Sequence, residues 1–546
     1  MKRHLEYPEC SMYDFLCSNA EKWMDKPALN YFSKLVSYRN MINEIDKCAD
    51  ALISAGITRG DRVSVCLPNI PQAVYLFYAI NKIGAVANMI HPLSSENEIV
   101  YALNLSESKM IIALDISEKK INAFADKTMV KSIVYVSVSE SMPWYLKMLY
   151  SLKQKKPELS GRSVPWKEFT GKTSGRSSSA HGKGDECAVI LYSGGTTGKP
   201  KGIELTNLNF NALALQSTDA CGCLETGDRV LAVMPVFHGF GLGVCIHTVL
   251  NFGGTSVILP KFSVRNFHKL LFRYRPAVIA GVPAIYESFI RNRHFKNKDL
   301  SFLKCVISGG DSLSVNTKIK LDNLLLEHGC KSTVREGYGL TECVTGSCLI
   351  PGNSEKRDSV GIPYADTFYK IVNSATLEEC PVGETGEIVL RGPTVMKGYL
   401  NEPEETANVL RKHSDGHIWL HTGDLGWMDS DGYVYFRDRL KKMIVSSGYN
   451  IYPQNIENVI NSHNDVLMCA VVGVPDEIKG QRVKAFVVPK DINRDNDRLK
   501  TELTELLKKE TAAYAMPKEI VFSKSLPKTK VGKIAYHQLV KGEVTR

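Results

Sequence analysis

One glycine-rich stretch constrains this chain more than any other: residues 193–202 read SGGTTGKPKG and follow the apolar run AVILY at 188–192. An apolar run that opens into glycines predicts a buried strand leading into a tight loop. Glycines let successive backbone N–H groups point toward one centre, and such concave backbone binds phosphate. The sequence therefore predicts a polyphosphate-binding loop formed by Ser193, Gly194, Gly195, Thr196, Thr197, Gly198, Lys199 and Lys201.

This loop differs from the common P-loop, GxxxxGK[ST], which would need glycine at 193 and Ser or Thr at 200. The chain has Ser193 and Pro200 instead. Pro200 also lacks the N–H that a following helix start would offer to phosphate. The alternative is an ordinary turn between two strands, but two lysines among three hydroxyl side chains favour a phosphate ligand.

The length of 546 residues is too great for one hydrophobic core and predicts at least two domains. No stretch offers about 20 uninterrupted apolar residues, and the first ten residues do not resemble a signal peptide. The 14 cysteines are scattered without a CxxC pair, which predicts unpaired thiols in a reducing compartment. We expect a cytoplasmic protein without a transmembrane segment; peripheral membrane contact stays open.

Charge is modest and unevenly distributed. The net charge is +10, and residues 440–546 hold 18 Lys+Arg against 12 Asp+Glu. A basic surface there suits a phosphate-bearing partner, although a solvated face explains it as well. No nucleic-acid-binding motif accompanies the charge, so we expect no nucleic-acid partner.

The order of apolar segments predicts an α/β fold. A strand at 62–67 precedes a helix at 72–83, and such alternation is typical of parallel sheets with packed helices. We predict a helix within 142–159, packed on its own domain or, alternatively, lying on a membrane interface. Residues 160–185 are rich in Gly, Ser and Lys, which predicts a mobile loop.

A change in pattern after residue 439 predicts a second, smaller unit. Residues 453–463 are helix-like with a proline in the first turn. Residues 466–472 and 483–488 are strand-like, and Leu499, Leu503, Leu506 and Leu507 lie on one helix face. The sequence predicts a large N-terminal domain of mixed and parallel sheets over 1–439 and a small mobile α/β domain over 440–546.

A second motif is EGYGLTEC at residues 336–343. Gly337 and Gly339 flank Tyr338, which would let its ring lie against a flat base. Glu342 offers a hard carboxylate suited to Mg²⁺ shared with phosphate oxygens, and Thr341 offers a hydroxyl. Alone, such a turn is most often an ordinary loop.

Together the two motifs resemble the adenylate-forming (AMP-binding) superfamily, which includes acyl-CoA synthetases, luciferases and the adenylation domains of peptide synthetases. Further segments carry the same resemblance: SGGD at 308–311, MPVFHG at 234–239, HTGDLGWMDSDGYVYFRDR at 421–439, SSGYNIYP at 446–453 and LPKTKVGKI at 526–534. The resemblance covers nearly the whole chain, and the motifs occur in family order. Within the superfamily, SGYNIYP favours the branch that activates fatty acids.

The resemblance implies how ATP is bound. Asp424 would accept hydrogen bonds from the ribose hydroxyls and Arg439 would donate to the same sugar, which fits a carboxylate and a guanidinium. Glu342, with Thr196, would hold Mg²⁺. The remaining implied ATP-binding residues are Gly309, Gly310, Glu336, Gly337, Tyr338 and Gly339.

The resemblance also implies where the acid binds. His238 would reach the substrate carboxylate, where relatives that activate amino acids carry an Asp nearby for the substrate ammonium. This favours an acid without an α-amino group, although a histidine in the core is the alternative. The implied acyl pocket consists of Phe240, Gly241, Leu242 and Gly309, which would suit a medium or long aliphatic chain; aryl and sterol-like acids stay open.

In the C-terminal domain, the resemblance implies that Lys533 stabilises the transition state at the α-phosphate. Lys441 matches the hinge position, and Gly448 with Tyr449 matches the loop used in the thioester-forming step. Catalysis is thereby implied for Lys533, Glu342, Thr341 and His238.

The resemblance implies an acid–thiol ligase that uses ATP, Mg²⁺ and coenzyme A. The acid would form acyl-AMP with release of pyrophosphate, and coenzyme A would then take the acyl group. One alternative is acyl transfer to an acyl carrier protein, and another is a luciferase-like oxygenase. A non-catalytic lipid or nucleotide binder is the alternative from another class. The sequence leaves monomer and homodimer open.

Overall fold

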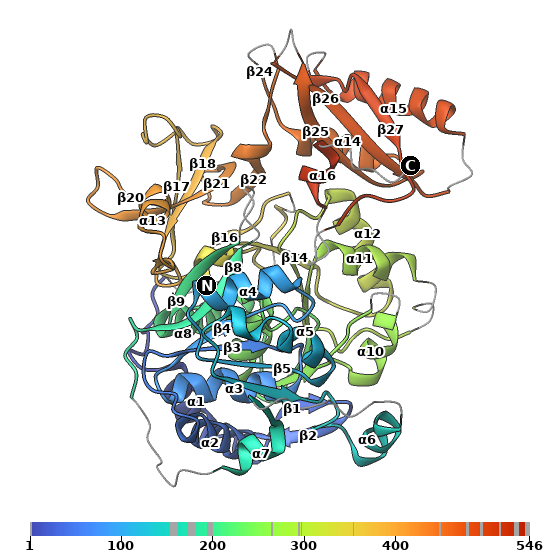
Figure 1. The fold of residues 1–546 in the computed structure, drawn as a ribbon. Coiled ribbons are helices and arrows are strands. Elements are labelled where there is room, and N and C mark those ends of the chain that lie inside the picture. The colour runs from blue at the N-terminus through green and yellow to red at the C-terminus, as the bar shows by residue number, and fades with distance from the viewer. Residues whose placement is uncertain are drawn as a thin grey trace.

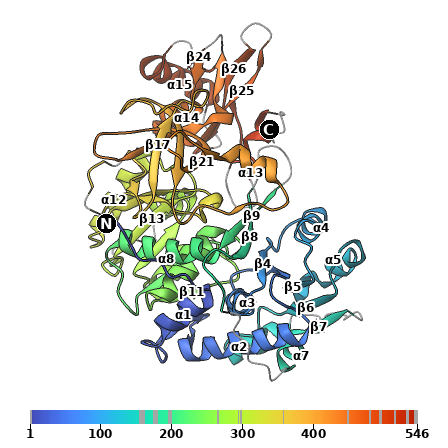
Figure 2. The same ribbon diagram turned by 90° about the vertical axis from the view of Figure 1, so that its left-hand side faces the viewer.

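The structure is a computed structural model. It describes residues 3–152, 162–172, 181–193, 200–263, 266–292, 295, 298–352, 354–356, 358–446, 449–476, 480–491, 495–512, 515–528 and 534–540. Two large sheets form the N-terminal part, a smaller sheet follows, and the C-terminal strands form a fourth sheet at one end of the molecule (Figures 1 and 2).

The first large sheet has eight strands in the order β19-β9-β8-β4-β3-β5-β6-β7. Neighbours from β8 to β7 are parallel, whereas β8–β9 and β9–β19 are antiparallel. β4 and β5 are buried along their whole length, as expected for parallel strands covered on both faces. The strand bounds are β3 Arg62–Cys66, β4 Val86–Met89, β5 Met110–Leu114, β6 Ser132–Val136, β7 Ser163–Pro165, β8 Cys187–Ser193, β9 Lys201–Thr206 and β19 Gly398–Tyr399.

The second large sheet has nine strands in the order β16-β15-β14-β13-β12-β10-β11-β1-β2. The strands from β14 to β1 are parallel, and antiparallel strands close both edges. The strand bounds are β1 Pro27–Tyr31, β2 Lys34–Ser37, β10 Arg229–Ala232, β11 Thr255–Ile258, β12 Val278–Gly281, β13 Cys305–Gly309, β14 Val334–Tyr338, β15 Cys348–Leu349 and β16 Ile362–Pro363.

Helices cover these two sheets. In α2 the buried residues Met41, Ile45, Cys48 and Leu52 recur at helical spacing, and Ser37 caps the helix by accepting from the Asn40 N–H. The N-terminal helices are α1 Met12–Ala20, α2 Tyr38–Ser54, α3 Pro71–Lys82, α4 Glu96–Leu105, α5 Glu118–Asn122, α6 Trp144–Ser151, α7 Trp166–Gly171, α8 Asn207–Cys221, the π-helix η3 Phe240–Thr248, α9 Val249–Asn251, α10 Phe267–Tyr274, α11 Pro283–Arg291, α12 Val315–Glu327 and α13 Pro403–Val409.

A five-stranded sheet connects the large sheets to the C-terminal part. Its order is β17-β18-β21-β20, and β22 also pairs with β21. Gly432 has φ of +82° in the turn at Asp431-Gly432 that joins the antiparallel strands β21 and β22. The strand bounds are β17 Phe368–Val372, β18 Gly386–Arg391, β20 Leu410–Lys412, β21 Ile418–Met428 and β22 Val434–Arg439.

The C-terminal strands form a sheet in the order β24-β23-β26-β25, with β27 paired to β26. Ile444, Ile460, Val487 and Leu503 belong to a core separate from that of the large sheets. This separate core supports our division at residues 439 and 440, which stays a prediction. The elements are β23 Ile444–Ser446, β24 Tyr449–Ile451, α14 Pro453–Ser462, β25 Val466–Asp476, β26 Gly480–Pro489, α15 Asn496–Glu510, β27 Glu519–Phe522 and α16 Tyr536–Val540.

The architecture confirms the predicted fold class, including the strand near 62–67 and the helix near 72–83. One local expectation was wrong. Residues 160–185 are not only a loop, because β7 and α7 lie within them and Trp166 and Phe169 are buried. The helix predicted within 142–159 is α6; one of its faces is half-buried and the other is exposed.

The 14 cysteines are all unpaired thiols, as their scattered spacing predicted. Among the described residues, no helix combines the length and the apolar character needed to cross a membrane.

A buried carboxyl group lies at the centre of the C-terminal unit. Glu457 of α14 accepts hydrogen bonds from the Val471 N–H at 2.7 Å and the Tyr536 hydroxyl at 3.1 Å. Burial raises the pKa of Glu457 to about 7, although the nearby Lys442 ammonium lowers it. Glu457 therefore joins α14, β25 and α16, and its charge changes near neutral pH.

This raised pKa predicts a pH-dependent stability. The folded state binds the Glu457 proton more tightly than the unfolded state, so this group's stabilisation is complete below about pH 4 and is lost as pH rises through 7. Glu457→Gln removes the ionisation, and we expect its advantage in thermal unfolding temperature over wild type to grow between pH 5 and pH 8. Glu505→Gln, an exposed position on α15, is the matched control. If the thermal unfolding temperatures of Glu457→Gln and wild type changed with pH in parallel, the raised pKa of Glu457 would be contradicted.

Candidate active site

Backbone contacts require glycine at the strand ends that carry the predicted adenine-binding residues. Gly309 at the end of β13 lies opposite Gly337 of β14, and a Cβ on Gly309 would lie 3.3 Å from the Gly337 carbonyl oxygen. Gly310 has φ of +80°. A Cβ on Gly339 would lie only 1.8 Å from the Thr345 carbonyl oxygen. The glycines predicted from sequence therefore keep two strand ends and a turn close together.

Glu336, one of the predicted ATP-binding residues, is buried in an ion pair between β14 and α12. Its side chain is buried, with Oε2 lying 2.5 Å from Lys318 Nζ and Oε1 accepting from the Leu313 N–H at 3.1 Å. Burial raises the pKa of Glu336, and the Lys318 charge opposes that shift. The carboxylate thus anchors β14 to α12, and nothing in the sequence motif indicated Lys318 as its partner.

Tyr338, Asp424 and Arg439 are brought together from three strands. The Tyr338 hydroxyl donates to Asp424 Oδ2 at 2.7 Å, and Arg439 Nε lies 3.2 Å from Asp424 Oδ1. Asp424 and Arg439 are also register partners in β21 and β22. The Asp424 charge is the main reason that the pKa of Arg439 is raised, and burial raises that of Tyr338. A buried carboxylate beside a half-exposed guanidinium can bind a diol.

Glu342 lies in the short helix η6, Thr341–Cys343, with Thr341 beside it. Its Oε1 accepts from the Tyr399 hydroxyl at 2.9 Å. Burial raises the pKa of Glu342, and Arg439 opposes the shift whereas Asp424 adds to it. A carboxylate that burial makes costly to ionise is stabilised by a nearby cation, so Glu342 fits a hard metal ion.

The segment with His238 packs directly on the Glu342 turn. A Cβ on Gly239 would lie 1.7 Å from the Val344 carbonyl oxygen, and Val344 itself has φ of +64°. His238 Nδ1 accepts from the Phe240 N–H at 3.2 Å, which fixes the ring at the start of η3. The structure therefore places His238 beside the predicted metal-binding turn.

The predicted acyl-pocket residues lie at the start of η3. Phe240, Gly241 and Leu242 are buried, and the Phe240 ring is 3.7 Å from the position of a Cβ on Gly309. A Cβ on Gly241 would lie 2.0 Å from the Pro235 carbonyl oxygen, so this turn also requires glycine. The four acyl-pocket positions predicted from sequence are neighbours in the structure.

Only the two ends of the predicted phosphate loop lie within the described residues. Ser193 and Lys201 are register partners at the ends of β8 and β9, as a strand–loop–strand unit requires. Lys201 forms an ion pair with Glu405, and its Nζ lies 4.5 Å from the centre of the Tyr399 ring. Gly194, Gly195, Thr196, Thr197, Gly198 and Lys199 lie outside the described residues.

Tyr399 is a site residue that the sequence motifs missed. It follows Gly398 in β19, which pairs with β9, and its ring and hydroxyl connect Lys201 to Glu342. Glu405 of α13 completes this group through its ion pair with Lys201. An aromatic residue after glycine carries no local signal for such a role, so only the sheet pairing indicates it.

The predicted C-terminal residues are only partly described. Gly448 and Lys533 lie outside the described residues, and of Lys441 and Tyr449 only the backbone is described, in the 3₁₀ turn Leu440–Lys442 and in β24. The chain after Lys533 returns close to the predicted hinge, because Lys442 Nζ lies 3.4 Å from the centre of the Tyr536 ring. The Gln454 N–H also donates to Asp438 Oδ2 at 3.0 Å, which ties the start of α14 to β22.

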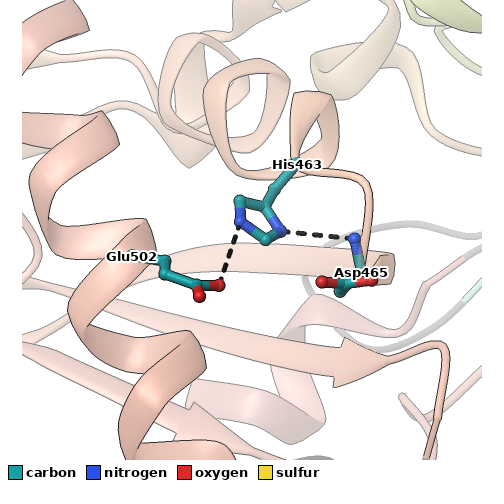
Figure 3. A group of neighbouring side chains, drawn as sticks. All are labelled: His463, Asp465 and Glu502. Carbon is teal, nitrogen blue, oxygen red and sulfur yellow. Dashed lines mark hydrogen bonds and ion pairs between the residues drawn. The ribbon is translucent and has the colours of Figure 1, made fainter.

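A histidine with two carboxylates at the edge of the C-terminal sheet has metal-ligand composition (Figure 3). Ligand-type atoms of His463, Asp465 and Glu502 lie within 4.8 Å of one another. Both ring nitrogens are engaged, however: Nδ1 accepts from the Asp465 N–H at 3.2 Å, and Nε2 lies 3.4 Å from Glu502 Oε2. Arg498 Nε lies 3.1 Å from the other Glu502 oxygen. We infer that these three residues hold the turn after α14 against α15 and do not form a metal centre.

The chain matches known protein families over most of its length. Residues 16–400 match the family described as AMP-binding enzyme, and residues 455–533 match the AMP-binding enzyme C-terminal domain. The chain therefore belongs to the AMP-binding enzyme family, as its motifs predicted.

Individual relatives define the class further. The chain is 35% identical to a long-chain-fatty-acid–CoA ligase of Bacillus subtilis (strain 168), over 99% of this chain and 96% of that protein. It is 32% identical to a feruloyl-CoA synthase of Amycolatopsis sp, over 95% of each. The crystal structure of the anthranilate CoA ligase AuaEII in complex with anthranoyl-AMP shares its fold, with a TM-score of 0.86, 24% identity and 99% coverage of each chain. The protein is an ATP-dependent acid–thiol ligase with ATP and CoA as substrates.

The buried pair of Lys318 and Glu336 gives a prediction about the stability of the site. Lys318→Met leaves the Glu336 carboxylate buried without its cation, which should lower the free energy of unfolding by about 3–5 kcal/mol. Lys320→Met, at an exposed position on the same helix, should change it by less than about 0.5 kcal/mol. Denaturant titration measures both.

Adding Glu336→Gln to Lys318→Met should recover much of the loss, because the neutral amide still accepts from the Leu313 N–H. A double variant no more stable than Lys318→Met would contradict the ion-pair account.

Proposed function

We propose that this ligase activates a medium- or long-chain fatty acid as acyl-AMP and transfers the acyl group to coenzyme A. The observation that carries the choice of acid is the buried apolar turn of Phe240, Gly241 and Leu242 beside Gly309. The identity to a long-chain-fatty-acid–CoA ligase supports it. A feruloyl-CoA synthase is nearly as similar, so an aromatic acid is the second candidate.

In the first step, a carboxylate oxygen attacks the α-phosphorus of ATP. A new oxygen–phosphorus bond forms, the bond to the bridging oxygen breaks, and pyrophosphate leaves. No base is needed, because a carboxylic acid of pKa about 4 is already ionised at neutral pH. The barrier comes from bringing two anions together, so cations and alignment supply the catalysis. We assign this role to Lys533, with Lys199 and Lys201 at the β- and γ-phosphates.

The nucleotide would lie where the eight-stranded, nine-stranded and five-stranded sheets meet. Asp424 and Arg439 would bind the ribose hydroxyls, supported by their ion pair of 3.2 Å. Tyr338 would lie against the adenine ring. Gly309 and Gly337, which are register partners at the ends of β13 and β14, carry no side chain that could cover the base.

Glu342 and Thr196 would hold Mg²⁺, and the burial of Glu342 supports this assignment. The ion supplies charge neutralisation for the phosphate oxygens when bound. Tyr399 positions Glu342 through its hydroxyl, and His238 would meet the substrate carboxylate beside the same turn. Phe240 and Leu242 would exclude water from the acyl chain.

In the second step, the thiol of coenzyme A attacks the acyl carbon. A carbon–sulfur bond forms, the carbon–oxygen bond to AMP breaks, the thiol proton passes to solvent and AMP leaves. We propose rotation about Lys441, which would withdraw Lys533 and bring Gly448 and Tyr449 to the nucleotide. Loading of an acyl carrier protein uses the same thiol chemistry, and comparing coenzyme A with a phosphopantetheine-bearing carrier protein as acceptor separates the two.

Lys533→Ala tests the assignment of the two steps. Its rate of acid-dependent ATP–pyrophosphate exchange should fall by at least about 10²–10³, because a transition-state charge is removed. Its rate of CoA acylation from preformed acyl-AMP should stay within about threefold of wild type. Lys524→Ala, an exposed lysine of the preceding segment, should retain both rates. If Lys533→Ala slowed both half-reactions equally, the assignment of Lys533 to the first step alone would be contradicted.

Wild-type exchange measured across a panel of acids tests the substrate class in the same assay. Higher kcat/KM for acids of 10–18 carbons than for ferulic acid would support the fatty-acid assignment. The reverse order would replace it with an aromatic acid and leave the two-step mechanism in place.

A further inference from the structure

The helix α6, Trp144–Ser151, has an outward face made of large apolar side chains. The exposed fractions are 78% for Trp144, 44% for Tyr145, 55% for Met148, 54% for Leu149 and 78% for Leu152, which follows the helix. Figure 1 shows α6 at the edge of the molecule, next to β2.

The helix α6 carries large apolar side chains on both faces, which is unusual for a helix on the surface of a protein in water. At about 100° of rotation per residue, the five exposed side chains occupy one face about 140° wide. Leu146, Lys147 and Tyr150 occupy the opposite face and are half-buried. A surface helix normally exposes a polar face. Here the exposed face is apolar, so a partner outside the chain is needed to remove it from water.

The β1–β2 turn extends this surface. Phe32 and Lys34 line a shallow groove together with Met142, Trp144, Tyr145 and Lys147. Lys34 is exposed at the rim, as is Leu35. We call α6, Leu152 and residues 32–35 the α6 surface; it combines apolar side chains with a cationic edge.

We propose that the α6 surface is a membrane-docking site that binds the interface of an anionic lipid bilayer. The composition matches that environment: tryptophan and tyrosine are favoured at headgroup depth, and leucine and methionine reach the acyl chains. Lys34 is exposed at the rim, whereas Lys147 lies on the half-buried face and pairs with Glu140 at 3.2 Å. Three lysines follow α6 in the sequence: Lys153, Lys155 and Lys156. Positive charge of this kind is complementary to anionic lipid.

Chemistry favours a bilayer over a protein partner. The exposed apolar strip is one helix of eight residues, about 12 Å long. A bilayer needs no matching surface, because it dissolves each apolar side chain separately. The inference is independent of the acid that the enzyme activates, since it concerns where the enzyme lies and not what it binds.

Sedimentation with lipid vesicles tests the proposal. Full-length protein should bind vesicles of 30% phosphatidylglycerol in phosphatidylcholine more tightly than pure phosphatidylcholine vesicles. The double variant Trp144→Ser/Leu149→Ser should lose at least about tenfold in partition coefficient, because two large apolar side chains no longer enter the bilayer. Lys34→Glu should weaken binding to the anionic vesicles only.

Leu326→Ser is the matched control, because Leu326 is 73% exposed on α12, outside the α6 surface. It should bind vesicles as wild type does, and all variants should retain ATP–pyrophosphate exchange in the absence of lipid. No binding of wild type to anionic vesicles, or equal binding by the double variant, would overturn the proposal. Light scattering that shows a dimer for wild type and a monomer for the double variant would also overturn the proposal, since the α6 surface would then bind a second copy of the chain.

Discussion

The Asp424 carboxylate connects the five-stranded sheet to the nine-stranded sheet, next to the point where the chain enters the predicted C-terminal domain. The carboxylate accepts a hydrogen bond from Tyr338, which ends a strand of the nine-stranded sheet, and pairs with Arg439, the last residue before the predicted C-terminal domain. Asp424 itself belongs to the five-stranded sheet. Because Asp424 is buried, its charge needs such partners for stabilisation. The junction between the two sheets therefore contains a carboxylate that is held by Tyr338 of the nine-stranded sheet and by Arg439 of its own sheet.

The chemistry of an acid–thiol ligase explains why such a junction is useful. Two anions must meet in the first step, and the cations that allow this must leave before a thiol can approach in the second. In the proposed mechanism the nucleotide stays on the N-terminal side, held by Asp424, while Lys533 and the loop around Gly448 exchange places. Glu342, Tyr399 and Lys201 form a second connected group on the same side. In this proposal the catalytic groups would divide into a fixed set on the sheets and a moving set beyond residue 439.

Local motifs predicted most of the fold and grouped many of the candidate site residues. They could do so because glycine requirements and strand periodicity depend on residues that are close together in the sequence. Gly239 and Gly339 are examples, since a Cβ at either position would lie within 2 Å of a backbone oxygen. Partners far apart in the sequence were not predictable. Tyr399 reaches Glu342 only because β19 pairs with β9, and Lys318 meets Glu336 only because α12 packs on β14. The packing of α7 was missed because two aromatic residues stand in a stretch of Gly, Ser and Lys. The sequence left open whether α6 packs on its domain or faces outward, because apolar residues on all sides of a helix do not reveal which face meets the protein.

The account depends most on the proposal that the ribose hydroxyls bind at Asp424. The most direct measurement is the affinity of wild type and Asp424→Asn for ATP and for 2′,3′-dideoxy-ATP, by calorimetric titration. Wild type should lose at least about tenfold in affinity when the hydroxyls are removed, whereas Asp424→Asn should bind the two nucleotides within about threefold of each other. If Asp424→Asn discriminates between them as strongly as wild type, the sugar is held elsewhere and the account is contradicted.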